Sequence, residues 1–427
     1  MTAAILLLGF FGLLAMGFPV AIALAGSGIV FAFIDGTIPM LAIVHRMASG
    51  VDSFPLLCVP FFIMAGLLMN TSGITERIYD FAVAAVGWMR GGLAQVNVVG
   101  SVIFAGMSGT AVGDAAGLGT IEVRAMKAHG YDPKFAVGIT AASSMLGPLL
   151  PPSLPLVIYG VSANASIGQL FAAGIVPGFL LAFCLMSMVY YYARVRGYGA
   201  DAVFRVSEMF RTFLRGALPL ATPVIIIGGM RMGAFTPTEG AICAVAWALL
   251  LGVVVFRTLG WKAIVKVSFE TVEITATILI IVAGSEIFGW LLTTTRASEL
   301  VVGWVLALTE QKWLILLLAN IFLLLVGLAI EPLPAILILT PIMLPIMESI
   351  GVDPVHFGLI MVLNLCIGLL TPPVGIVLFI LARVGNISFE DAARGVWPFM
   401  IPLVGVLLLC TYVPEIVMWL PTMWYRS

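Results

Sequence analysis

Residues 146–153 read Leu-Gly-Pro-Leu-Leu-Pro-Pro-Ser, inside a segment that is otherwise apolar enough to cross a membrane. A Pro-Pro pair removes two backbone N–H donors and its rings clash with the preceding turn, so a helix cannot continue through it. Carbonyl groups near Gly147 and Leu150 then lack helical partners. Irregular backbone at membrane depth survives only where protein buries it or where it lines a polar cavity. The stretch is therefore either a packed kink or part of a binding site.

A similar stretch returns in the second half of the chain, where residues 367–374 read Ile-Gly-Leu-Leu-Thr-Pro-Pro-Val. Both copies place a glycine four residues before the Pro-Pro pair. Sliding the chain against itself by 221 positions also places Gly106 on Gly327, Pro133 on Pro354 and Pro177 on Pro398. This pattern indicates an internal duplication. Interrupted apolar segments at corresponding positions of two halves are typical of the substrate site of a secondary transporter.

The composition excludes a soluble globular domain. Hydrophobic residues make up 62% of the 427 residues and charged residues 10%, whereas about a quarter of the residues of soluble domains are charged. We therefore expect a polytopic helical membrane protein. The five cysteines form no Cys-x-x-Cys pair, the three histidines form no zinc motif, and no phosphate-binding loop is present. We therefore expect transport to be driven by an ion gradient or by a partner protein. We expect the chain to bind no cofactor and no transition metal.

Each half contains a predicted re-entrant helical hairpin. The first covers about residues 95–128, because Met107 to Asp114 interrupts an apolar run with small and polar residues. A single glycine-flexed transmembrane helix is the alternative, since small residues also serve helix packing in membranes. The corresponding segment of the second half favours a hairpin in both halves. It covers about residues 313–350 and is split at Ile330-Glu-Pro-Leu-Pro334, where prolines forbid a continuous helix.

The remaining organisation follows from charge and apolar length. The first repeat is assigned to residues 1–197 and the second to 216–427, joined by an amphipathic cytoplasmic connector over 198–215. Broken helices are expected at about 135–160 and 356–382. Residues 2–35 form one broken crossing or two short ones, and 37–53 and 257–272 are predicted interfacial helices. The end of the first hairpin opposite its tip carries basic residues, and that of the second hairpin carries acidic ones. This difference predicts an inverted repeat of two halves in an all-α membrane protein.

Unwound segments supply the oxygen ligands that a dehydrated Na⁺ requires, because their carbonyl groups are free of helical partners. The candidates for a first sodium site are Ser108, Gly109, Thr110, Gly147, Leu150 and Pro152. Those for a second site are Gly327, Glu331, Gly368, Thr371 and Pro373. Exposed helix N-termini suit a substrate carboxylate. The substrate-binding candidates around them are Thr110, Asp114, Pro151, Ser153 and Pro372. Asp114 is either a functional carboxylate or the cap of the second hairpin arm.

With these motifs assembled, the chain resembles the large membrane subunit of the tripartite ATP-independent periplasmic (TRAP) transporters of bacteria and archaea. The resemblance spans essentially the whole chain and rests on motifs at residues 53–66, 108–114, 147–153, 157–160 and 370–375. It implies sodium-driven, elevator-type uptake of an organic acid across the cytoplasmic membrane. The implied partners are a periplasmic solute-binding protein and a small four-helix membrane subunit, within the lipid bilayer and without nucleic acid. Glu331 departs from the family pattern, which usually has Asp at the second hairpin tip.

Two rival functions remain. A stand-alone ion-coupled carboxylate symporter would need no binding protein. An intramembrane aspartyl protease is suggested by Tyr79-Asp80 and Val112-Gly-Asp114, although Ala111 stands where that motif requires glycine. A catalytic aspartate pair would also not explain a duplicated Pro-Pro break.

Overall fold

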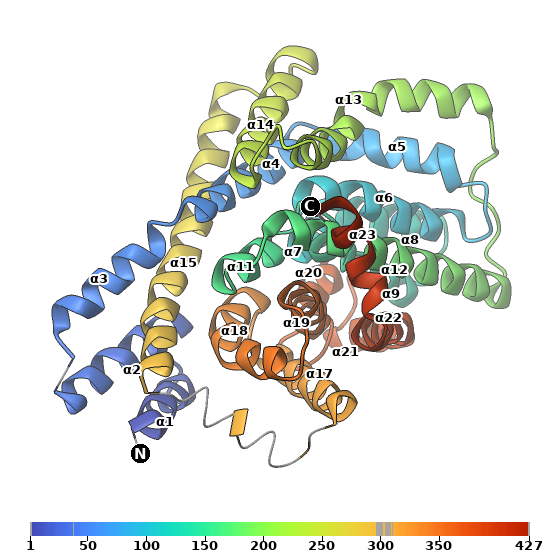
Figure 1. Cartoon of the computed structure of the whole chain (residues 1–427). Coiled ribbons are helices and arrows are strands. Elements are labelled where there is room, and N and C mark those ends of the chain that lie inside the picture. The colour runs from blue at the N-terminus through green and yellow to red at the C-terminus, as the bar shows by residue number, and fades with distance from the viewer. Residues whose placement is uncertain (1, 37, 296–301, 304–308, 310, 426–427) are drawn as a thin grey trace.

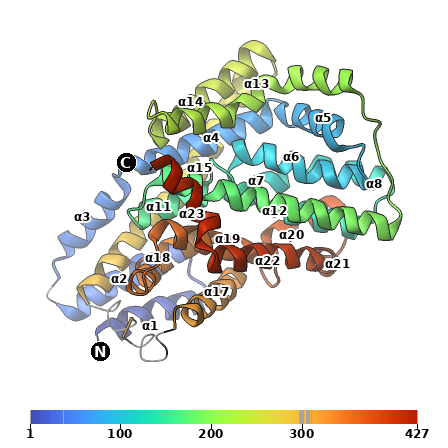
Figure 2. The same ribbon diagram turned by 45° about the vertical axis from the view of Figure 1, so that its right-hand side comes forward.

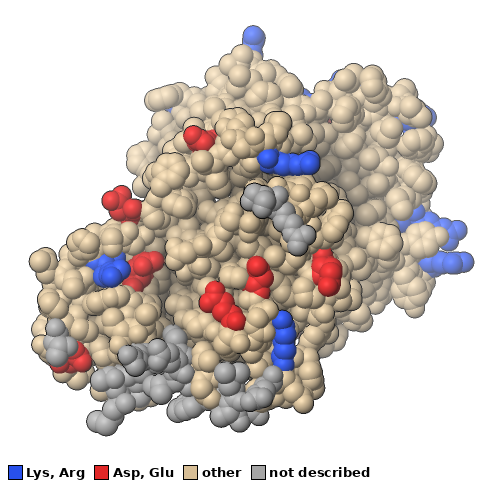
Figure 3. Space-filling view, viewed as in Figure 1, with Lys and Arg blue, Asp and Glu red and all other residues tan. Residues whose placement is uncertain are grey.

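The chain is built from helices. The computed structural model describes residues 2–36, 38–295, 302–303, 309 and 311–425, and within them no residue lies in a β-strand. Eight helices of this part are long and apolar enough to cross a membrane. Uncharged residues cover most of the face seen in Figure 3, and charged residues occupy a small part of it. The predicted all-α polytopic membrane fold is confirmed (Figure 1).

The N-terminal part of the chain forms a series of short helices. In chain order they are α1 (Thr2–Ala15), α2 (Val20–Asp35), α3 (Met40–Val51), the 3₁₀ turn η1 (Phe54–Leu57), α4 (Cys58–Thr71) and α5 (Ile74–Val86). Gly9 of α1 faces the Cβ of Ser27 in α2, so these helices pack closely against each other. Residues 2–35 therefore form two short helices rather than one broken crossing.

The next helices contain the first predicted hairpin and the first broken span. They are α6 (Gly92–Ser108), α7 (Ala111–Ala116), α8 (Leu118–Ala128), α9 (Pro133–Ser143), α10 (Leu146–Leu149), α11 (Leu154–Ser162) and α12 (Ile167–Arg196). The chain reverses at Gly109, whose φ of +62° lies in the region that favours glycine. A second interruption at Gly117 divides the returning arm. The direction changes by 42° between the α9–α10 segment and α11.

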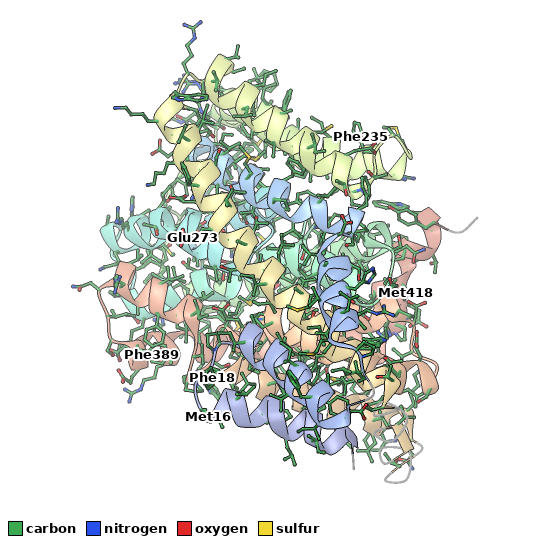
Figure 4. The ribbon with its side chains drawn as sticks, turned by 90° about the vertical axis from the view of Figure 1, so that its left-hand side faces the viewer. Met16, Phe18, Phe235, Glu273, Phe389 and Met418 are labelled. Carbon is green, nitrogen blue, oxygen red and sulfur yellow. The ribbon has the colours of Figure 1, made fainter. Side chains whose placement is uncertain are left out.

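The middle of the chain differs from two expectations, the boundary after residue 215 and the separate interfacial helix over 257–272. It consists of α13 (Val206–Arg231), α14 (Pro237–Leu249), the π-helical turn η2 (Leu250–Val255) and α15 (Trp261–Thr294). The boundary placed after residue 215 lies inside α13, because Pro219 and Pro223 are accommodated within one helix. The interfacial helix predicted over 257–272 is not separate either. It is the first part of α15, whose 34 residues extend about 51 Å at 1.5 Å per residue (Figure 4).

The second hairpin and broken span lie in the last third of the chain. The helices are α17 (Lys312–Ala329), α18 (Pro332–Ser349), α19 (Pro354–Gly368), α20 (Ile376–Gly385), α21 (Phe389–Val396), η3 (Trp397–Phe399), α22 (Met400–Tyr412) and α23 (Pro414–Tyr425). α17 ends at Ala329 and α18 starts at Pro332, so the hairpin reverses at Ile330–Glu331. Residues 369–375 interrupt the second span.

The two halves are interlocked through their outer helices. α2 packs on α15 of the second half, where a Cβ at Gly284 would lie 3.0 Å from the carbonyl oxygen of Ala21. In return, α14 packs on α4 of the first half, and the Thr238 hydroxyl donates a hydrogen bond of 3.3 Å to the carbonyl of Phe54. Figures 1 and 2 show these four helices beside the hairpins and broken spans. They are called the scaffold below.

A buried polar contact ties each hairpin to its broken span. In the first half, the Ser143 hydroxyl of α9 donates to the side-chain oxygen of Asn97 in α6 over 2.6 Å. In the second half, the Asn364 amide of α19 donates to the side-chain oxygen of Asn320 in α17 over 2.7 Å. Residues 143 and 364 correspond in the 221-residue register. The duplication seen in the sequence therefore reappears in two similar side-chain contacts, although their hairpin members, Asn97 and Asn320, are 223 positions apart.

Candidate functional site

A cavity of about 630 Å³ lies between the scaffold and the interrupted helices. Each hairpin tip contributes to its wall, through residues 107–113 and 331–334. Each broken span contributes as well, through Pro148, Pro152 and Leu154 in the first half and Leu369 and Ile376 in the second. The opposite wall belongs to α4 and α15. Segments that are more than 200 residues apart in the chain thus meet at one place.

The first hairpin tip is in direct backbone contact with the first break. The amide of Leu154 donates a hydrogen bond of 3.1 Å to the carbonyl of Gly109. A Cβ at Gly109 would collide with the carbonyl oxygen of Pro152, and one at Gly147 would lie 2.8 Å from that of Thr110. The glycines therefore permit the two backbones to approach closely, which brings several carbonyl groups together.

The hydroxyl groups of this cluster have different environments. Thr110 caps α7, since its Oγ1 accepts a hydrogen bond of 3.0 Å from the amide of Gly113. Ser153 caps α11 through the amide of Leu156 at 3.3 Å and also donates to the carbonyl of Pro148. The Ser108 hydroxyl is buried and has no hydrogen-bond partner among the described residues. An unpaired buried hydroxyl is costly, so it is available to a ligand.

The second hairpin and break form an equivalent contact. Gly327 lies against α19, where a Cβ would come 3.1 Å from the carbonyl oxygen of Leu365, and Gly368 faces the carbonyl of Gly327. The Thr371 hydroxyl donates a hydrogen bond of 3.0 Å to the carbonyl of Gly368. Glu331 precedes α18 without capping it through its side chain, and it lines the cavity.

The predicted site residues divide into two groups. Those that line the cavity are Ser108, Gly109, Thr110, Pro152 and Glu331. The cavity wall does not include Gly147, Leu150, Pro151, Ser153, Gly327, Gly368, Thr371, Pro372 or Pro373. In this second group, three glycines lie where a hairpin contacts a broken span: Gly147, Gly327 and Gly368. Thr371 bonds within the second break. Leu150 packs against Gly178 of α12.

Asp114 is neither a residue of the cavity wall nor a helix cap, which were the two roles predicted for it. Its side chain is 2% exposed and does not line the cavity, and Thr110, not Asp114, caps the helix. Both carboxyl oxygens lack a hydrogen-bond partner among the described residues, as do those of Glu122, which is 1% exposed. The prediction that Asp114 contacts substrate is not supported, because the helical arm turns this side chain away from the cavity and into the hairpin.

Several residues of the cavity wall were missed in the sequence. Gly66 and Asn70 of α4 and Glu273 and Thr277 of α15 all line it. Gly66 lies under the first hairpin tip, where a Cβ would be 3.3 Å from the carbonyl oxygen of Met107. A carboxylate within an apolar helix is a signal of function, and it could have identified Glu273. Glu239, in contrast, has a local role, since it forms a capping box with Thr236.

The two aspartates of the protease alternative lie in unlike surroundings. Asp80 is exposed on α5 and lines a surface pocket with Arg77 and Arg215. Asp114 is enclosed within the first hairpin. A catalytic pair would need both carboxyl groups in one active site, which this arrangement does not provide.

Comparisons with known proteins agree with the fold. Residues 7–416 match the family described as "Tripartite ATP-independent periplasmic transporter, DctM component". The sialic acid TRAP transporter large permease protein SiaM of Vibrio cholerae is 43% identical over 413 residues, which are 97% of each chain. The C4-dicarboxylate TRAP transporter large permease protein DctM of Pseudomonas aeruginosa is 37% identical, over 94% of this chain and 93% of that relative.

A solved structure shows a similar fold. The Alcanivorax borkumensis YdaH transporter, described as having an unusual topology, aligns with a TM-score of 0.64 at 16% identity. The alignment covers 87% of this chain and 88% of that one. The family match over residues 7–416, together with the two permease relatives, confirms the resemblance found in the sequence. The chain belongs to the DctM family of large permease components of tripartite ATP-independent periplasmic transporters, and is a transporter subunit rather than an enzyme.

Proposed function

We propose that this chain is the permease subunit of a sodium-driven importer of an organic acid in the cytoplasmic membrane. Its partners are a small membrane subunit of four helices and a periplasmic binding protein that delivers the substrate. One observation carries this proposal: both hairpin tips and both broken spans meet at one cavity. The names of the two permease relatives support an organic acid, since one takes sialic acid and the other C4-dicarboxylates.

Sodium fits the chemistry of the two hairpin–break contacts. Na⁺ binds through oxygen atoms, and interrupted helices present carbonyl groups that no helix uses. The first contact adds the free hydroxyl of Ser108, and the second adds the hydroxyl of Thr371. Glu331 adds a carboxylate at the second hairpin tip. The sequence contains no phosphate-binding loop for ATP, so an ion gradient is the natural energy source.

The substrate carboxylate fits the start of α20. The first N–H groups of a helix have no intrahelical acceptor, and the helix dipole places partial positive charge there. Ile376, the first residue of α20, lines the cavity. α18 also begins at the cavity, but Pro332 and Pro334 lack N–H groups and offer fewer donors. The α20 end is therefore the better anion site.

An elevator movement fits the division into a scaffold and a block of interrupted helices. The block consists of α6–α11 and α17–α20, and it carries every predicted cation ligand. Its first hairpin tip rests on α4 at Gly66, a residue without a side chain. The nearest hairpin atoms at this point belong to the backbone of Met107 and Ser108, and such a contact suits sliding.

Uptake by proteoliposomes tests the proposal. The large and small subunits are reconstituted together, and a labelled organic acid is offered with its binding protein under an inward sodium gradient. We expect uptake only with both the gradient and the binding protein. Uptake by this subunit alone on a sodium gradient would instead support the stand-alone symporter. Uptake that persists when potassium replaces sodium would contradict sodium coupling.

A further inference from the structure

The charge of the cavity wall restricts which organic acid it suits. Among the described lining residues the charged ones are Glu273 and Glu331, and no lysine, arginine or histidine is present. Carboxylates a few ångströms apart repel one another, more strongly where water is excluded. One substrate carboxylate can be balanced by the bound cations and the α20 end. A second one would face Glu273 without a compensating positive group.

Glu273 is placed to contact substrate from the scaffold side. It lies on α15, its residue is exposed, and it lines the cavity (Figure 4). The Thr277 hydroxyl donates a hydrogen bond of 3.0 Å to the backbone carbonyl of Glu273, and no described residue bonds to the Glu273 carboxylate. One turn earlier on the same helix, Glu270 lies 3.7 Å from Lys266 and is outside the cavity wall. An ionised carboxylate is an acceptor only, so Glu273 suits hydroxyl or amide N–H donors of a ligand.

Asn70 adds a donor to the same wall. It lies at the end of α4, and its side-chain oxygen accepts a hydrogen bond of 3.3 Å from the Thr75 hydroxyl. Its NH₂ group then remains for the cavity, which Asn70 lines. The scaffold wall therefore presents one strong acceptor and one donor. Neighbouring hydroxyl groups of a sugar-like molecule, each both donor and acceptor, match this combination.

We infer that Glu273 is a specificity residue, which makes the permease select polyhydroxylated monocarboxylic acids over dicarboxylates. This inference rests on the proposed function, since it names the substrate class of the same cavity. Sites that hydrogen-bond a substrate hydroxyl reject analogues lacking it, because their polar groups are left unpaired. Here charge repulsion acts in the same direction against a second carboxylate.

Ligand-dependent melting of the purified complex of large and small subunits tests this inference. The probes are N-acetylneuraminate, gluconate and glucuronate as hydroxylated monocarboxylates, and succinate and fumarate as dicarboxylates, all in saturating NaCl. A ligand that binds only the folded state raises the melting temperature. We expect stabilisation of the wild type by at least one monocarboxylate and by neither dicarboxylate. E273Q and E273A should raise the half-maximal monocarboxylate concentration at least about tenfold, or about 1.4 kcal/mol.

The matched control is E270Q, on the same helix but outside the cavity, which should behave as the wild type. Equal stabilisation by both probe classes, or unchanged affinities in E273Q and E273A, would overturn the inference and leave the proposed function standing. If no probe stabilises the wild type in sodium, the cavity is not an organic-acid site and the proposed function itself fails. E273Q keeps the size of the side chain but removes its charge and replaces one acceptor oxygen by an NH₂ donor, so it tests the carboxylate even if E273A folds poorly.

Discussion

The amide of Leu154 donates a hydrogen bond of 3.1 Å to the carbonyl of Gly109, which joins the first broken span to the first hairpin tip. Both residues lie at chain interruptions, where backbone groups have no helical partner. Pairing them satisfies one donor and one acceptor at membrane depth, where an unpaired group is costly. The tip and the break are therefore held together and respond together to whatever binds there.

Replacing Gly109 by alanine should destabilise the protein more than replacing a glycine of similar conformation elsewhere. Gly109 has a φ of +62°, and a Cβ there would collide with Pro152. Gly130 has a φ of +80° but open space around it. The left-handed conformation costs a non-glycine residue about 1–2 kcal/mol in both variants. Unfolding of the detergent-solubilised proteins should show the larger loss in G109A, and equal losses would contradict the close contact.

Bulky replacements of Ser108 and Thr371 should weaken sodium dependence. We expect S108L and T371L each to raise the sodium concentration for half-maximal uptake at least about tenfold, the scale of losses seen when metal sites are perturbed. Ser187 of α12 is the control, because its exposed hydroxyl bonds only within its own helix. Sodium titrations of uptake measure the effect. An unchanged sodium requirement in both variants would show that the cation sites lie elsewhere.

A branched side chain at Gly66 should block transport without unfolding the protein. In G66V the new methyl groups would enter the gap between α4 and the hairpin tip, where a Cβ already lies 3.3 Å from the Met107 carbonyl. We expect uptake to fall strongly while the melting temperature changes little. Gly228 of α13 has open space around it, so G228V serves as control. Wild-type uptake in G66V would argue against movement of this tip along α4.

Alkaline pH should destabilise the base of the first hairpin through Tyr131. Burial, followed by the hydrogen bond of 2.5 Å to Asp201, raises the pKa of Tyr131 above its ordinary value. A group with a raised folded pKa contributes stability below its unfolded pKa, here about 10, and loses it as pH rises further. Melting temperature should therefore fall above about pH 10 in the wild type and less so in Y131F. The control Y191F, at an exposed tyrosine, should follow the wild type.

The interrupted elements could be predicted because their causes are local. A Pro-Pro pair breaks a helix in any surroundings, and Gly109 permits the turn that its neighbours Ser108 and Thr110 flank. The structure places both breaks within a residue or two of the predicted positions. Residues 95–128 could have been a hairpin or a single helix. Because the chain is duplicated, the prolines of the second hairpin favoured a hairpin in the first half as well.

Other features depend on packing between distant segments, and the sequence carried little signal for them. α13 runs through the expected boundary at residue 215 because Pro219 and Pro223 are tolerated inside it. Asp114 points into its hairpin because α6 packs beside it, which its local motif does not indicate. Asn70 and Glu273 face the cavity only because α4 and α15 lie opposite the hairpin tips.

The exchange of α2 and α14 between the halves has a consequence for biosynthesis. The chain leaves the ribosome from its N-terminus, so α4 is complete long before α14, its covering helix, has been translated. A nascent first half waits in the bilayer with that flank facing lipid.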